Sequence, residues 1–120
     1  MEAAPGLIEF DDFAKVDIRA GRVVEAAPLA GARIPAIRLV LDFGPELRLK
    51  QSSARITEAY DPSDLVGRMV LAVVNFPPRR IAGWRSDVLV LGLYSSGGEG
   101  PVVLIRPDEH PAVRPGDRLG

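Results

Sequence analysis

The segment from Asn75 to Ser86 carries the side chains whose types and spacing are best suited to binding a ligand. Its three basic residues are Arg79, Arg80 and Arg85. Their planar guanidinium groups suit phosphate or carboxylate, whereas Phe76 and Trp84 offer flat apolar faces for a nucleobase or an apolar side chain. Two prolines between Phe76 and Arg79 restrict the backbone, so less conformational entropy is lost on binding. The segment therefore predicts a stiff binding loop, and its residues leave open which ligand it takes.

Several residues of this loop also have a purely structural interpretation. Asn75 can bond to neighbouring backbone and so serve only to stabilise a turn. Phe76 follows an apolar run, which favours packing in the core, whereas Trp84 fits core packing and a contact surface equally well. Adjacent arginines usually point in different directions, so we expect one of Arg79 and Arg80 to be structural and the other to contact a partner.

Lys50 and the two serines after it form a second candidate segment. Lys50 alternates with Leu47 and Leu49, so the pattern places its side chain outward or toward a ligand surface. We expect Ser52 or Ser53 to cap a short helix, whose first backbone N–H groups could also hold a phosphate.

The composition excludes several kinds of site. The chain has no cysteine, which excludes disulfides, iron–sulfur clusters and thiolate metal sites. Its single histidine, His110, lies in a polar, proline-containing stretch without a second histidine at metal-ligand spacing. A serine nucleophile needs a base and an orienting group, and no motif supplies them. We therefore expect no enzymatic activity, no metal and no cofactor.

The charge is unevenly distributed. The 120 residues carry a net charge of -1, which argues against binding nucleic acid through bulk charge. Residues 48–86, however, hold seven basic and three acidic residues, a net charge of +4, against -5 in the rest of the chain. This pattern fits a local anion site and equally a scatter of solvated charges.

The length fits one compact domain, which we place at residues 13–120 after an N-terminal tail of residues 1–12. No apolar run approaches the roughly 20 residues that cross a bilayer, and the acidic N-terminal region lacks the basic start of a secretory signal. We therefore expect a cytoplasmic protein without a membrane span.

The hydrophobic pattern predicts short strands. Residues 37–43 and 47–50 alternate apolar with polar on either side of a Gly-Pro turn, which is typical of a hairpin. Residues 16–24 also alternate, but the phase slips at Gly21 and Arg22, which predicts a bulge there.

Three later apolar runs, at residues 69–74, 88–93 and 102–105, read as strands buried on both faces, and the glycine-rich residues 95–101 read as a hairpin turn. Between the third and fourth strands, Asp61 and Pro62 begin a short helix that ends before Gly67. This order predicts an all-β fold, a small OB-fold barrel with a short helical insertion after strand three. In such barrels one face and its flanking loops bind oligonucleotides or extended ligands.

Three segments together resemble the tRNA-binding-domain family: Lys50-Gln51-Ser52-Ser53-Ala54, Val16-Asp17-Ile18-Arg19 and residues 75–83. The resemblance extends from about Phe13 to the terminal Pro-Gly-Asp-Arg-Leu-Gly. In this family the Lys-x-Ser motif and the loop that ends in Gly-x-x-Ser lie near the RNA-facing surface. By position, the resemblance implies binding roles for Lys50, Ser52, Ser53, Asn75, Arg79, Arg80, Gly83 and Ser86.

The resemblance also implies an OB-fold homodimer without catalytic activity. Phe76-Pro77-Pro78 stands where tRNA-binding relatives more often have a leucine and a single proline, which favours a chaperone-like branch associated with secretion. We therefore expect a secretion chaperone that binds unfolded or precursor polypeptides. The alternative is a tRNA-binding module that recognises tRNA shape and backbone, with Phe76 or Trp84 available to stack a base.

Overall fold

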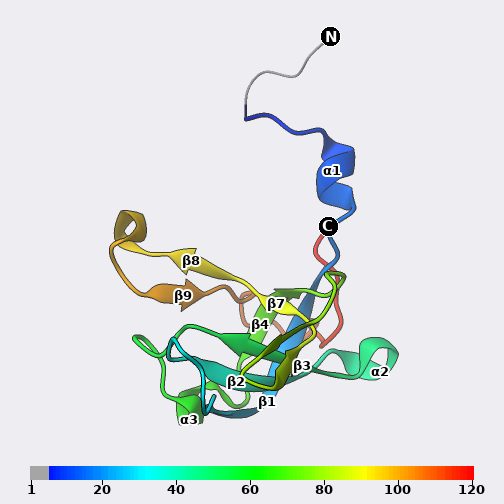
Figure 1. Ribbon diagram of the computed structural model, residues 1–120. Helices are drawn as coiled ribbons and strands as arrows, with labels where there is room; N and C mark the ends of the chain where they lie inside the picture. The colour runs from blue at the N-terminus through cyan, green and yellow to red at the C-terminus, as the bar shows by residue number, and fades with distance from the viewer. Residues whose placement is uncertain (1–5) are drawn as a thin grey trace.

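The computed structural model describes residues 6–120, and its framework is a five-stranded antiparallel sheet curled into a nearly closed barrel (Figure 1). The strand order is β3-β2-β1-β4-β7. These strands are β1 (Ile18–Pro28), β2 (Ile37–Asp42), β3 (Leu49–Ala54), β4 (Met69–Val73) and β7 (Leu89–Val90). Beside β7, the backbone N–H of Asp87 donates to the carbonyl of Gln51 at 2.8 Å, which brings the two ends of the sheet together. The predicted all-β OB-type barrel is confirmed.

Short helices connect the strands. Helix α2 (Gly44–Leu47) forms the turn of the β2–β3 hairpin, and α3 (Pro62–Leu65) is the insertion expected after the third strand, with Asp61 at its N-cap position. The expected helix capped by Ser52 or Ser53 is wrong, because both serines lie within β3. Residues 56–60 form a hydrogen-bonded turn instead, in which the N–H of Tyr60 donates to the carbonyl of Ile56 at 3.1 Å.

The core fills the inside of the barrel. Ile37, Leu39 and Leu41 alternate along β2 and are fully buried, as their spacing predicts. They pack in one cluster with Phe43 from the end of β2 and Leu65 from α3. The helical insertion therefore closes one end of the core.

The predicted bulge in β1 is present, but it lies at Val24, two residues after Arg22. The pairing of β1 with β2 shifts register between Val23 and Glu25, whereas Gly21 and Arg22 pair regularly with β4. Gly21 is needed for a different reason: a Cβ atom there would lie 2.6 Å from the ring of Phe43.

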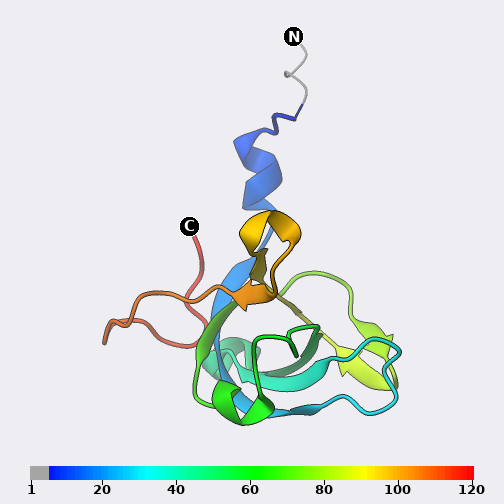
Figure 2. The same cartoon turned by 90° about the vertical axis from the view of Figure 1, so that its left-hand side faces the viewer.

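Two elements project from the barrel, in different directions. They are α1 (Phe10–Ala14) and the hairpin of β8 (Gly92–Tyr94) and β9 (Val102–Leu104), whose turn contains the 3-10 helix η1 (Ser96–Gly98) (Figures 1 and 2). The expectation that residues 88–93 and 102–105 are buried on both faces is wrong for this hairpin, because Leu93 is 59% exposed and Val103 is 38% exposed. The hairpin leaves the barrel after β7, so nothing in the described chain covers its apolar side chains on both faces.

The C-terminal segment returns to the start of β1. The N–H of Gly116 donates to the carbonyl of Ala20 at 2.7 Å, and the N–H of Leu119 donates to that of Ile18 at 2.8 Å. Of the helices among residues 6–120, none has the length and apolar character needed to cross a membrane.

Candidate functional site

The predicted loop at residues 75–86 is mostly a β-hairpin. Strands β5 (Arg79–Ile81) and β6 (Trp84–Ser86) pair across a turn at Ala82 and Gly83, both of which have positive φ, +50° and +79°. Two-residue turns with positive φ at both positions match the twist of paired strands, and glycine adopts this conformation readily. Gly83 therefore shapes the turn that positions the arginines.

The hairpin places like charges opposite each other. Arg80 pairs directly with Arg85, and both side chains are exposed. The guanidinium of Arg80 donates to the carbonyl of Gly83 at 3.3 Å, and that of Arg85 forms an ion pair with Asp87 at 2.6 Å. Like charges directly across a strand pair are destabilising by themselves, and a bound anion would relieve the repulsion. Arg79 is exposed on the same strand, paired with Ser86.

The expected division of the adjacent arginines into a structural and an exposed one does not appear as a difference in burial, although the side chain of Arg80 bonds within the hairpin and that of Arg79 does not. Both Arg79 and Arg80 are exposed, because β5 pairs only with β6 among the described strands. The paired geometry points them to different faces of the hairpin.

Trp84 fastens the hairpin to the barrel. Its indole N–H donates to the carbonyl of Ser52 at 2.8 Å, and the guanidinium carbon of Arg38 lies 5.0 Å from the centre of its ring. Trp84 is half-buried, so it combines the two roles that the sequence left open. Arg38 was not among the predicted site residues, although its alternation with buried Ile37 and Leu39 already placed it outward.

The Lys-x-Ser segment is more structural than predicted. Ser52 is fully buried, and its hydroxyl donates to the carbonyl of Val88 at 2.7 Å across the closing seam of the barrel. Lys50 is half-buried and shares a face of β3 with Ser52, whereas Leu49 on the other face is 59% exposed. Of the two expected orientations of Lys50, the outward one is therefore wrong, and a position toward a ligand surface stays a prediction. Ser53 and Ser86 are half-buried on either side of this seam.

Asn75 links two distant parts of the chain instead of its own turn. Its amide nitrogen donates to the carbonyl of Lys15 at 2.7 Å, and its amide oxygen accepts from the N–H of Asp17 at 3.0 Å. These two bonds attach the start of the 75–86 segment to the chain between α1 and β1. The predicted bonding of Asn75 to its neighbours is wrong, since its partners lie 58 and 60 residues away.

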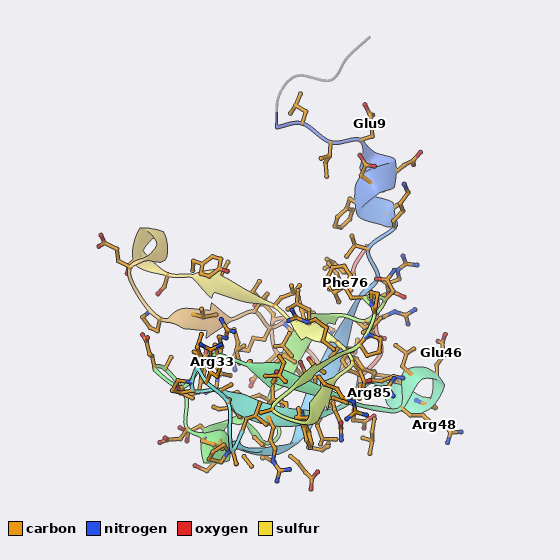
Figure 3. All side chains as sticks on the ribbon, in the orientation of Figure 1. Glu9, Arg33, Glu46, Arg48, Phe76 and Arg85 are labelled. Atoms are coloured by element: carbon orange, nitrogen blue, oxygen red, sulfur yellow. The ribbon has the colours of Figure 1, made fainter. Side chains whose placement is uncertain are left out.

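Phe76 is 48% exposed, which contradicts the expectation that it packs in the core. Figure 3 places it on the side of the barrel that faces α1, whereas Arg85 lies farther from that helix. Helix α1 carries two more exposed rings, Phe10 and Phe13, whose centres are 6.2 Å apart. The ring of Phe76 and the guanidinium of Arg85 therefore lie in different parts of the 75–86 segment.

The β1–β2 connection, residues 29–36, flanks the hairpin. A Cβ atom on Gly31 would lie 4.0 Å from that of Ala82 in the hairpin turn, and Figure 2 shows the cyan connection beside the yellow-green hairpin. Arg33 in this connection is exposed. The connection and the hairpin turn, about 50 residues apart in the sequence, therefore lie close together, although Figure 3 shows Arg33 and Arg85 at opposite sides of the barrel.

Near this surface, a network of ion pairs joins the start of β1 to the C-terminal segment. Asp17 pairs with Arg19 at 2.7 Å and with Arg118 at 3.5 Å. The hydrogen bond from Arg19 is the main reason that the pKa of Asp17 lies below its ordinary value. Across residues 6–120, no cluster of three or more His, Cys, Asp or Glu side chains is arranged to hold a metal ion.

Comparisons with known proteins agree with this geometry. Residues 18–117 match the family described as "Putative tRNA binding domain". A methionine–tRNA ligase of Acidithiobacillus ferrooxidans is 40% identical over 112 residues, which are 93% of this chain and 16% of the ligase. The chain thus spans about one sixth of the length of the curated ligases that it matches.

Two solved structures are similar over nearly the whole chain. The chaperone CsaA of Bacillus anthracis is 47% identical, with a TM-score of 0.86, and the match covers 96% of this chain and all of that protein. The CsaA chaperone protein of Picrophilus torridus is 39% identical, with a TM-score of 0.85, and covers 95% of this chain and all of that protein. With its barrel, its 75–86 hairpin and a family match over 100 residues, the chain belongs to the tRNA-binding-domain family.

Proposed function

We propose that the chain is a CsaA-like, non-catalytic chaperone that binds unfolded or precursor polypeptides on their way to secretion. The observation that carries this proposal is the set of large apolar side chains left exposed on the α1 side of the barrel. Phe10 is 75% exposed, Phe13 on the same helix is 38% exposed and Phe76 is 48% exposed. The ring centres of Phe10 and Phe13 are 6.2 Å apart, and contiguous exposed apolar groups on a small protein mark interaction sites. The full-length likeness to two CsaA chaperones supports the same conclusion.

We include a homodimer in this proposal. The radius of gyration is 15.3 Å, against about 13 to 14 Å for a compact chain of this length, because α1 and the β8–β9 hairpin project from the barrel. Projecting elements with exposed apolar residues gain stability when a second copy covers them. Light scattering at micromolar concentration should give the mass of two chains, and a single-chain mass would contradict the dimer.

The polypeptide-binding proposal is tested with a permanently unfolded, labelled polypeptide, such as reduced and carboxymethylated lactalbumin. Fluorescence anisotropy should give saturable binding. The affinity should change little between about 50 and about 200 mM salt, because salt screens charges and apolar contacts carry none. Phe76→Ser should weaken binding about fivefold, whereas Val66→Ser, a change at a site that is 53% exposed beyond α3, should not. Equal binding by both variants and the unchanged protein would reject Phe76 as part of the surface.

A second candidate function, tRNA binding, is favoured by a separate observation. Arg80 and Arg85 are paired across one face of the hairpin, and Arg79 is exposed on the other face. Such a group of exposed guanidinium groups suits the phosphate backbone of an RNA. The family match and the identity to a methionine–tRNA ligase support this alternative.

Salt dependence separates the two functions. Binding to phosphates releases counterions, so the affinity for bulk tRNA should fall steeply between about 50 and about 200 mM salt. Tight, salt-sensitive tRNA binding without capture of the unfolded polypeptide would replace the chaperone proposal with the tRNA-binding one. A cytoplasmic location is part of the proposal in either case, and fractionation of cells that express the tagged protein tests it.

A further inference from the structure

A second charged region lies away from the 75–86 hairpin. It is a hollow of about 470 Å³ between β1, the connection from α3 to β4, and residues 106–113. Figure 2 shows residues 106–113 as the orange-to-red segment at the left of the barrel, with the β5–β6 hairpin at the right. The hollow shares no lining residue with the surface described above. We call it the arginine hollow.

Three arginines line the hollow: Arg22, Arg68 and Arg106. Arg22 donates from Nη1 to the carbonyl of Gly67 at 2.9 Å, and Arg68 donates from Nε to the carbonyl of Asp64 at 3.0 Å. The guanidinium of Arg68 also stacks 5.4 Å from the centre of the Tyr60 ring. These contacts hold two guanidinium groups in place while using one N–H donor of each.

None of the three arginines forms an ion pair with a carboxylate among residues 6–120. This distinguishes them from Arg19, Arg85 and Arg118, each of which does. A guanidinium group has five N–H donors and prefers acceptors that two of them can reach together, as in a phosphate or carboxylate. Arg22 and Arg68 therefore offer positively charged donors that are held in place and form no ion pair with a carboxylate among residues 6–120.

Residues 106–113 supply hydrogen-bond acceptors to the arginine hollow. Asp108, Glu109 and His110 line the hollow on the side of residues 106–113. The N–H of Ala112 donates to Nδ1 of His110 at 3.0 Å, which fixes the ring and leaves Nε2 as the nitrogen that carries the proton in neutral imidazole. Carboxylates repel an anion but accept hydrogen bonds from hydroxyl or amino groups. The two sides of the hollow thus suit a ligand that carries a phosphate at one end and hydroxyl donors at the other.

We propose that the arginine hollow binds a phosphate ester of nucleotide size, with Arg22, Arg68 and Arg106 on the phosphate and the carboxylates of Asp108 and Glu109 on sugar hydroxyls. A volume of about 470 Å³ lies within the usual range for small-ligand sites. The ligand is either a free nucleotide or one nucleotide of an RNA. The inference stands apart from the proposed function, since no residue of the α1 side or the 75–86 hairpin takes part.

Nuclear magnetic resonance of the full ¹⁵N-labelled chain tests the proposal, with adenosine 5′-monophosphate as the probe. Saturable shifts are expected at the amides of Gly67, Arg68, Met69 and Val113, which line the hollow. Inorganic phosphate should shift the same amides more weakly, because it lacks the hydroxyl groups. No shift with adenosine monophosphate, or shifts that do not saturate and spread over all exposed arginines, would overturn the site.

Arg106→Gln is the main variant, because Arg106 is exposed and its loss removes no structural bond of the kind made by Arg22 and Arg68. It should weaken nucleotide binding about tenfold, the usual effect of losing one charge-assisted contact. Arg33→Gln makes the same charge change on the β1–β2 connection, outside the hollow, and should leave the affinity unchanged. Equal loss in both variants would mean a general charge effect and would reject the proposal.

Bulk tRNA distinguishes the two sources of phosphate. If tRNA shifts the amides of the hollow and Arg106→Gln weakens tRNA binding, the ligand is a nucleotide unit of RNA. If only the mononucleotide shifts them, the ligand is a free nucleotide. Polypeptide capture by the α1 side is measured separately with Phe76→Ser, so each proposal can fail without the other.

Discussion

The barrel and the elements that project from it satisfy opposite requirements. Inside the barrel, Ile37, Leu41 and Ser52 are fully buried, and among the described residues no buried side-chain nitrogen or oxygen lacks a hydrogen-bond partner. On α1 and the β8–β9 hairpin, apolar side chains of the same kinds are exposed. Val102 and Leu104 of β9 still pack against the core at the base of the hairpin, whereas Leu93 and Tyr94 of β8 are exposed. The difference predicts that stability comes mainly from the first region, and we propose that the exposed side chains of the second serve binding.

The largest effect should come from the barrel core. Leu41→Ala should lower the free energy of unfolding by about 3 kcal/mol, because it removes buried methyl groups and leaves a cavity. Leu93→Ala, the same substitution on the projecting β8, should change it by less than about 0.5 kcal/mol. Urea unfolding of both variants measures the contrast. Comparable losses in the isolated chain would mean that the β8–β9 hairpin contributes to the fold as much as the core does.

The next effect concerns the arginine side of the hairpin. If this surface binds RNA, Arg79→Gln with Arg80→Gln should weaken tRNA binding about tenfold and reduce the salt slope by about two, since two phosphate contacts are lost. Arg114→Gln, an exposed arginine in the C-terminal segment, serves as the control. Anisotropy titrations over a range of salt concentrations measure both quantities. An unchanged slope in the double variant would remove these arginines from the RNA surface.

A smaller effect separates structure from binding within the Lys-x-Ser motif. Ser52→Ala should lower the free energy of unfolding by about 1 kcal/mol, because the buried hydroxyl bonds to Val88 across the barrel seam. Neither tRNA nor polypeptide affinity should change. Ser53→Ala at the neighbouring, half-buried position should leave stability within about 0.5 kcal/mol. Loss of binding at full stability in Ser52→Ala would instead make this serine a ligand contact.

The smallest effect is a dependence of stability on pH. The pKa of Asp17 is lowered in the folded state, chiefly by its hydrogen bond from Arg19. A lowered pKa favours the folded state above the carboxyl's ordinary value of 3.8 and loses this contribution as the pH falls through the folded value. The unchanged protein should therefore lose stability on acidification below about pH 4, and Asp17→Asn should lose less. Urea unfolding at a series of pH values measures this, with Glu25→Gln at an exposed site on β1 as the control.

Much of the fold could be predicted because its signals are local. Alternation at Ile37, Leu39 and Leu41 predicts a strand with one buried face, and the structure has that strand as β2. Asp61 followed by Pro62 predicts the start of a helix, and α3 begins there. Such patterns depend on residues within one element, so they are readable without knowledge of the chain's path.

The candidate site was only partly predictable, because its side chains are positioned by distant partners. The segment 75–86 was identified as a unit, but its hairpin pairing sets Arg80 opposite Arg85. The half-buried position of Lys50 follows from which face of β3 meets the core. The alternation of Leu49 with Lys50 in the sequence does not decide this, because it favours burial of the leucine, and the structure leaves the leucine exposed. Arg38 joins the site only because Trp84 folds back over it.

By itself, the sequence determined the short strands, the helical insertion after the third strand, the lack of thiol chemistry and the concentration of arginines between residues 48 and 86. Tertiary structure alone decided that Ser52 is sealed in the barrel seam, that Asn75 reaches Lys15 and Asp17, and that Phe76 faces solvent. The physical reason is that propensity and hydrophobic period are properties of neighbouring residues. Burial and hydrogen-bond partners arise only when strands far apart in the sequence close into a barrel.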